Sequence, residues 1–329
     1  MSYRHLTMDE RNVIWRMKLL GKSQGETARC LGRAPCTVGR ELRRNREFDG
    51  RYFPRSAQAL ANVRKRDKIT RPRTGDADLM AHVETKIQAR WSPEQIAGRL
   101  QTQPPGHLAG KTVSHATIYR WIWACGDRSQ RLRPYLRVAC KQRRKPYGKP
   151  SKRGQIPNRT SIDDRPEVVA DRTRLGDWEG DTVVGKGRSG YVVTNVDRVS
   201  RYTVARKIER ATAASVTAAL HDAMRRLPAD RRKTQTFDNG REFAGHENIA
   251  RLLKMSVYFA HPYSSWERGT NENTNGLLRQ YLPKAMGFTQ LTDWQLACYI
   301  RQLNNRPRKC LNYRTPAEVF WNRTVALTM

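Results

Sequence analysis

The chain has 329 residues, and its 63 Lys and Arg against 30 Asp and Glu give a formal net charge of +33 at pH 7. Such an excess of positive charge repels itself unless a polyanion is near, which favours a nucleic-acid-binding protein. Apolar residues make up 38% of the sequence, which excludes general disorder, and no apolar run is long enough to cross a membrane.

Residues 6–45 are predicted to form three short helices. Two S/T-x-x-E capping boxes begin the first two, because each pair of side chains can satisfy free backbone N–H groups at a helix start. Ala28 is small enough for close helix packing, Gly32 can make a turn, and Val38 can lock the following helix in place. This spacing is typical of a helix-turn-helix.

The third predicted helix carries the candidate DNA contacts. Its outward positions are polar or cationic, which suits the phosphates and base edges of a major groove. A three-helix bundle with a solvated basic face is the alternative. The candidate DNA-binding residues on this helix are Thr37, Arg40, Arg43 and Arg44.

A second helical unit is predicted after a basic segment. Ser92, Pro93 and Gln95 have the order of an N-cap, a first-turn proline and an N3 partner. Ser114 can cap a further helix that places Arg120 on its outer side. The loop between the two helices is too long for a tight helix-turn-helix, so both a second DNA-binding unit and a helical spacer stay open.

The basic segments on either side of this unit are expected to be linkers. Residues 62–73 have the composition of a flexible tether, and residues 131–160 hold eleven Lys and Arg and no acid. A block of like charge stays extended until phosphates neutralise it, so we expect the second segment also to follow DNA backbone. The expected divisions are 1–61 (helix-turn-helix domain), 62–90 (linker), 91–127 (second helical unit), 128–170 (linker) and 171–329 (catalytic domain with C-terminal helices).

The second half of the chain changes to an α/β pattern. Three strands are followed by a helix, a strand, a helix, a strand and further helices, which predicts a mixed sheet covered by helices on both faces. The predicted strands are 178–184, 191–197, 202–208, 234–237 and 255–259.

Three carboxylates lie where functional residues of such sheets are usually found, at strands, their ends and helix starts. Asp181 lies in the first strand, Asp238 at the end of the fourth, and Glu272 opens a late helix predicted over 271–281. Right-handed connections place the first and fourth strands side by side, so Asp181 and Asp238 should be neighbours. Three converging carboxylates without His or Cys favour hard cations, above all two Mg²⁺ ions.

Each carboxylate also has a simpler interpretation. Asp238 could belong to a turn with the Asn and Gly that follow it, and Glu272 could be a favourable charge at a helix start. Glu179 and Asp177 share a strand face with Asp181, because side chains alternate along a strand.

The sequence resembles the DDE transposases of bacterial insertion sequences, in the insertion-sequence-thirty family. The resemblance rests on LGRAPCTVGRELRRN, WSPEQIAGRL, SHATIYRWI, GDWEGDTVVGK, TFDNGREF, HPYSSWERGTNENTNGLLRQYLPK and NNRPRKCLNYRTPAEVF, which run from end to end of the chain. The last two acids, Asp238 and Glu272, have 33 residues between them, which is the spacing of that family.

The resemblance implies a ribonuclease-H-like catalytic domain that depends on two Mg²⁺ ions, with Mn²⁺ as a substitute. It assigns the first catalytic acid to Asp181, beside Asp238 and Glu272, and leaves Glu179 accessory. Arg279, seven residues after Glu272, matches the family's basic position and would clamp a DNA phosphate. The implied partners are the double-stranded DNA of the element's terminal inverted repeats and of the target.

The expected function is therefore DNA strand cleavage and strand transfer by a cytoplasmic, nucleoid-associated transposase. A catalytically silent DNA-binding regulator and a nonspecific nuclease are the alternatives. Two DNA ends must meet, so we expect a homodimer or a larger assembly on DNA. Trp294, Ala297 and Ile300 are candidates for its interface, and packing against the catalytic core is the competing role for these residues.

Overall fold

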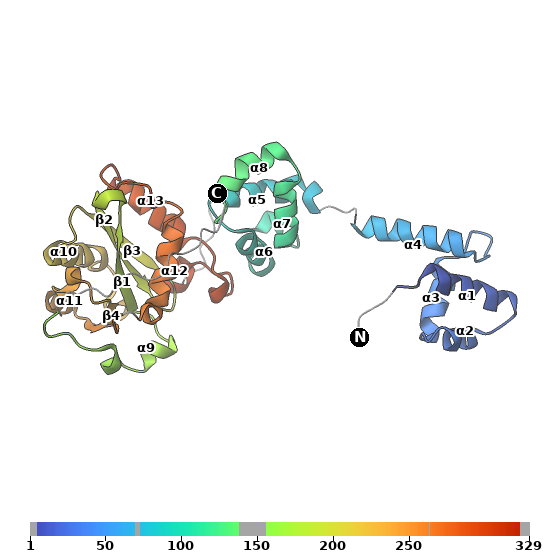
Figure 1. The fold of residues 1–329 in the computed structure, drawn as a ribbon, viewed down its shortest axis with the longest axis horizontal. Coiled ribbons are helices and arrows are strands. Elements are labelled where there is room, and N and C mark those ends of the chain that lie inside the picture. The colour runs from blue at the N-terminus through green and yellow to red at the C-terminus, as the bar shows by residue number, and fades with distance from the viewer. Residues whose placement is uncertain (1–4, 70–72, 138–155, 263, 323–329) are drawn as a thin grey trace. The chain divides into compact units, whose positions relative to one another are not determined.

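The computed structural model describes residues 5–69, 73–137, 156–262 and 264–322. The chain divides into two compact units, Met1–Asp76 and Ala77–Met329 (Figure 1). Within the described ranges, none of the helices combines the length and the apolar character needed to span a bilayer.

The first unit begins with the predicted three helices. They are α1 (Met8–Leu19), α2 (Gln24–Cys30) and α3 (Pro35–Arg44), and both predicted capping boxes are present. Gly32 has a φ of 61°, the left-handed conformation that lets the chain turn between α2 and α3. Ala28 and Val38 are fully buried, so they pack the helices together as their spacing predicts.

A fourth helix, α4 (Pro54–Ile69), completes this unit. A buried ion pair joins Arg11 of α1 to Glu41 of α3 at 2.7 Å. Gln58 of α4 accepts a hydrogen bond from Arg11, and the Tyr52 hydroxyl donates to Glu41 at 3.2 Å. The Gln58 contact holds the first half of α4 against α1, and the helix continues to Ile69. The expectation of a flexible tether is therefore wrong for residues 62–69.

The second unit opens with four helices that share one apolar core. They are α5 (Ala77–Gln88), α6 (Pro93–Thr102), α7 (His115–Trp123) and α8 (Gly126–Leu132). Ser92 and Ser114 cap α6 and α7, as predicted. Leu79, Val83 and Ile87 of α5 are buried in this core, so part of the expected 62–90 linker is a packed helix.

The expected linker over 128–170 is only partly described. α8 continues to Leu132, and the short helix α9 occupies Val168–Asp171. Residues 138–155, which hold much of the basic block, lie outside the described residues.

The α5–α8 helices are fastened to the end of the chain. Arg99 of α6 forms a bidentate ion pair with Glu318 of α14 (Pro316–Phe320), with N–O distances of 2.5 and 2.9 Å. A Cβ atom on Gly98 would lie 2.2 Å from the Tyr313 ring, so only glycine permits this approach. The second helical unit is therefore packed against the C-terminal part of the catalytic half.

The catalytic half contains one five-stranded sheet. Its strands are β1 (Asp177–Val184), β2 (Tyr191–Asp197), β3 (Thr203–Ile208), β4 (Thr234–Phe237) and β5 (Ser256–Phe259). The order is β3-β2-β1-β4-β5; β1 pairs antiparallel with β2 and parallel with β4. The predicted mixed sheet is confirmed, as is the prediction that its first and fourth strands are neighbours.

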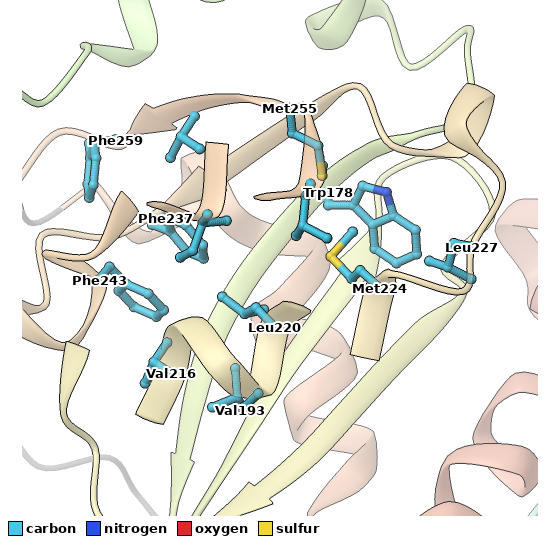
Figure 2. Close-up of a cluster of buried hydrophobic side chains, with 14 of the residues drawn as sticks. Trp178, Val193, Val216, Leu220, Met224, Leu227, Phe237, Phe243, Met255 and Phe259 are labelled. Carbon is cyan, nitrogen blue, oxygen red and sulfur yellow. The ribbon is translucent and has the colours of Figure 1, made fainter. Parts of the chain in front are cut away.

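Helices cover both faces of this sheet. The helices α10 (Ala213–Met224) and α11 (His246–Leu253) enclose one apolar cluster, which contains Val193 of β2, Leu220 of α10 and Phe237 of β4 (Figure 2). The helices α12 (Gly269–Leu278) and α13 (Asp293–Asn304) enclose another, which contains the preceding residue of the same strand, Val192. Successive residues of β2 thus face opposite layers.

We predict that the Arg99–Glu318 pair is a major stabilising contact of the second unit. Arg99→Met leaves a carboxylate of 1% exposure without its cation, which should cost about 3–5 kcal/mol. Differential scanning calorimetry should show a lower Tm for the transition of residues 77–329. Lys309→Met is the control, because it breaks the exposed 2.7 Å pair with Glu94 between neighbouring segments and should cost less than about 1 kcal/mol. Equal losses of Tm would contradict this prediction.

Candidate active site

The parallel pairing of β1 with β4 places two candidate acids beside each other. Glu179 is opposite Thr236 in the register, so two further residues along each strand lead to Asp181 and Asp238. The guanidinium of Arg268 lies between them, 3.0 Å from Asp238 Oδ2 and 3.8 Å from Asp181 Oδ1. The structure therefore brings Asp181 and Asp238 to one location.

Asp181 is held in place by neighbours on two elements. The side-chain amide of Asn275 donates to its Oδ2 at 2.9 Å, and the backbone N–H of Thr182 donates to its Oδ1 at 2.8 Å. Burial raises the pKa of Asp181, and the nearby Asp238 adds to this effect, while Arg268 opposes it. A partly buried carboxylate beside a second carboxylate favours binding of a cation.

Glu272 lies in the first turn of α12 with an exposed side chain. It precedes Asn275 by three residues, and residues at this spacing are neighbours on one helix face. Glu272 is thus on the part of α12 that reaches Asp181. Among the described residues, however, no three acidic, His or Cys side chains are arranged to hold one ion. The structure brings two of the three acids together and puts the third on the adjoining helix.

Glu179 has a different environment from Asp181, although both lie on the same strand. Its side chain is fully buried, and Oε2 accepts a 2.9 Å hydrogen bond from the backbone N–H of Asn271. The Asn271 side chain donates in turn to the Glu179 carbonyl at 2.7 Å. Arg198 forms a 3.2 Å ion pair with Glu179. These contacts fasten the start of α12 to β1.

Asp177, the other acid on this strand face, is also buried. It pairs with Arg174 at 3.0 Å and accepts a hydrogen bond from the Thr234 hydroxyl. Asp181 is therefore the acid of β1 that faces Asp238 across Arg268. Sequence reasoning did not identify Arg268, Asn271 or Asn275 as site residues, although Arg268 and Asn275, at −4 and +3 from Glu272, have the spacing of neighbours on one helix face.

The donor set fits a hard divalent cation. Asp181 and Asp238 supply carboxylate oxygens, Glu272 lies on the adjoining helix α12, and Mg²⁺ binds such oxygens in preference to nitrogen or sulfur. Asp181 is partly desolvated and is repelled by its neighbour, so a bound cation would relieve an unfavourable interaction.

The predicted DNA contacts lie on three helices. Arg40, Arg43 and Arg44 are exposed on α3, and Thr37 is half-buried there. Arg120 is exposed on α7.

Arg279 caps the C-terminus of α12 and donates to the Val184 carbonyl at 3.0 Å and to the Leu282 carbonyl at 3.4 Å. It therefore joins the end of β1 to the end of α12 in this structure. Its contact with DNA, like those of the other basic residues, stays a prediction.

The predicted interface residues line a groove away from these acids. Trp294, Ala297 and Ile300 of α13 form one wall, and residues of β3 and α10 form the rest of a cavity of about 1150 Å³. The Trp294 side chain is 75% exposed. None of Asp181, Asp238 and Glu272 lines this groove.

Comparison with protein families finds two domains in the chain. Residues 171–265 match the integrase core domain, and residues 2–45 match a helix-turn-helix domain. The first match covers all five strands and the two aspartates, and the second covers α1 to α3.

Curated transposases are similar over almost the whole chain. The transposase for insertion sequence element IS4351 of Bacteroides fragilis is 40% identical over 96% of this chain and 95% of its own length. The transposase for IS1086 of Cupriavidus metallidurans is 40% identical over 97% and 94%, respectively. The transposase InsI for IS30A of Escherichia coli is 38% identical over 98% and 85%.

Among solved structures, the catalytic core domain of BIV integrase is 22% identical and covers 44% of this chain and 93% of its own, with a TM-score of 0.37. The identities to the curated transposases extend over the helix-turn-helix domain, the integrase core and the C-terminal helices alike. The protein belongs to the family of transposases of insertion sequence IS30 and its relatives, in which an integrase-type, ribonuclease-H-like core follows an N-terminal helix-turn-helix domain.

Proposed function

We propose that this chain binds the terminal inverted repeats of its own insertion sequence and catalyses Mg²⁺-dependent cleavage and transfer of DNA strands. The observation that carries the proposal is the placement of Asp181 and Asp238 on neighbouring parallel strands, beside the helix that bears Glu272. The intact pair of aspartates gives no support to the alternative of a catalytically silent regulator.

Asp181, Asp238 and Glu272 are the proposed metal ligands and the catalytic acids. Two divalent cations held by these carboxylates would supply activation of a water molecule and charge stabilisation of the oxygen that leaves the phosphodiester. Asn275 orients the Asp181 carboxylate through its 2.9 Å hydrogen bond. Arg279, at the far end of the same helix, is the proposed clamp for a DNA phosphate.

The remaining domains deliver DNA to this site. We propose that α3 enters a major groove of the terminal repeat, with Arg40 or Arg43 as base readers. Arg120 on α7 adds a phosphate contact. Two DNA ends must be joined, so the active form is a homodimer or larger assembly on DNA, located in the cytoplasm at the nucleoid. The groove beside Trp294 is a candidate surface for that assembly.

Removing any one proposed catalytic acid should separate binding from catalysis. Asp181→Asn, Asp238→Asn and Glu272→Gln should each bind a labelled end fragment as the native protein does, but lower nicking and joining by at least about a hundredfold, because a metal ligand is lost. Glu247→Gln, at an exposed acid of α11 outside the groove beside Trp294, is the control. The native protein should lose activity when a chelator replaces Mg²⁺. Full activity in any of the three variants would refute the site assignment.

The recognition role of α3 predicts an effect on specificity. Arg40→Ala should weaken binding to the terminal repeat by about 1–3 kcal/mol and reduce its preference over a scrambled duplex. Arg16→Ala removes the same charge from an exposed position on α1 and should leave that preference unchanged. Competition binding at fixed salt measures both. An equal preference in the Arg40 variant and the native protein would exclude a base-reading role.

We propose that Glu179 acts as a positioning residue, because its contacts fix the start of α12. Glu179→Ala should destabilise the second unit by about 3–5 kcal/mol, since it leaves Arg198 buried and unpaired. Glu179→Gln also removes the charge that pairs with Arg198, but it keeps an acceptor for the Asn271 N–H, so the folded protein should retain nicking within about tenfold of the native rate. If Glu179 were a metal ligand, the Gln variant would be as inactive as Asp181→Asn.

A further inference from the structure

Arg268 occupies the space between the two aspartates. Its guanidinium donates to Asp238 Oδ2 at 3.0 Å and to the Gly180 carbonyl at 3.1 Å, and it lies 3.8 Å from Asp181 Oδ1. The side chain is only 13% exposed. It reaches this position from the turn Ser265–Arg268, directly before α12. The turn before α12 thus places a positive charge between Asp181 and Asp238, and the same helix carries Glu272.

The position of this guanidinium has an electrostatic cause. Two carboxylates that face each other in a partly buried site repel, and a positive group between them reduces that repulsion. In the described part of the chain, Arg268 is the cation that forms ion pairs with both Asp181 and Asp238. It therefore offsets the repulsion between the two carboxylates in the protein alone. A divalent cation bound to the same oxygens would have the same effect more strongly.

We propose that Arg268 is the resident counter-ion of the metal-free site and that a divalent cation binds by displacing it. The two cations compete for Asp238 Oδ2 and Asp181 Oδ1, because one oxygen lone pair cannot serve both at close range. This inference rests on the proposed function, since it assumes that these carboxylates hold the metal.

The displacement is coupled to Glu272 by the chain itself. Arg268 is the N-cap residue of α12, and its side chain makes no capping hydrogen bond to the helix. Glu272 follows one helical turn later. While the guanidinium lies between the aspartates, no cluster of three acids forms among the described residues. Withdrawal of Arg268 removes the group that occupies the site and leaves Glu272 to complete the set of ligands.

Metal binding to the full chain without DNA tests this proposal. Isothermal titration with Mn²⁺ should give a dissociation constant about five- to tenfold lower for Arg268→Gln than for the native protein, because the competing charge is gone. Arg268→Lys keeps the charge and should stay within about twofold of the native value. Arg241→Gln removes an equal charge from an exposed position three residues after Asp238, and it should also stay within about twofold.

Two outcomes would overturn the proposal. The first is an Mn²⁺ affinity of Arg268→Gln equal to or weaker than that of Arg241→Gln. The second is used if Arg268→Gln is less stable than the native protein. Competition predicts that adding Mn²⁺ raises the Tm of this variant more than it raises the Tm of the native protein, so an equal or smaller rise would refute it. Failure of the proposed function has a different signature, since native protein and Asp181→Asn would then bind Mn²⁺ equally.

Discussion

The parallel pairing of β1 with β4 is the constraint on which the rest of the site depends. It fixes Asp181 and Asp238 on adjacent strands at the same level, where their carboxylates repel each other. The fold balances that repulsion with the guanidinium of Arg268 and with hydrogen bonds from Asn275 and Thr182 to Asp181. A sheet that holds two like charges together in this way favours binding of a cation. That cation is the Arg268 guanidinium in this structure and would be a divalent ion in the proposed metal-bound site.

The helix α12 is aligned with β1 by two matched contacts. Asn271 bonds to Glu179, and Asn275, one turn later, bonds to Asp181, two residues further along the strand. Four residues of helix rise about 6 Å and two residues of strand about 6.6 Å, so the two elements keep step over this distance. This match explains why Glu179 and Asp181 have different roles on one face: α12 covers the first acid and leaves the second at its edge. The anchoring acid and the catalytic candidate thus depend on the same pair of elements.

Local signals predicted much of this fold. Capping residues such as Ser92 and Ser114 start α6 and α7 where the sequence places them, and the prediction that the first and fourth strands are neighbours is confirmed. The misses came from tertiary contacts. The helix α4 forms where a tether was expected, because Gln58 in its first half bonds to Arg11 of the Arg11–Glu41 pair. Alternation along β1 could not separate Glu179 from Asp181, because the difference in their burial comes from α12, which contacts Glu179 through Asn271. The catalytic roles of the three acids and the DNA contacts stay predictions.

The buried glutamates of this strongly basic chain have one kind of partner, and the two aspartates of the site have another. Glu41, Glu179 and Glu318 are buried, and each pairs with one arginine from another segment of its unit. Each of these sites is locally neutral. Asp181 and Asp238 differ because two carboxylates share a single guanidinium, which leaves a net negative charge at one point of a chain with a net charge of +33. DNA phosphates brought near by the surrounding positive charge would be repelled from that point. The two proposed divalent cations would make the net charge at the two aspartates positive. Metal binding would therefore favour the approach of the phosphodiester through charge balance alone.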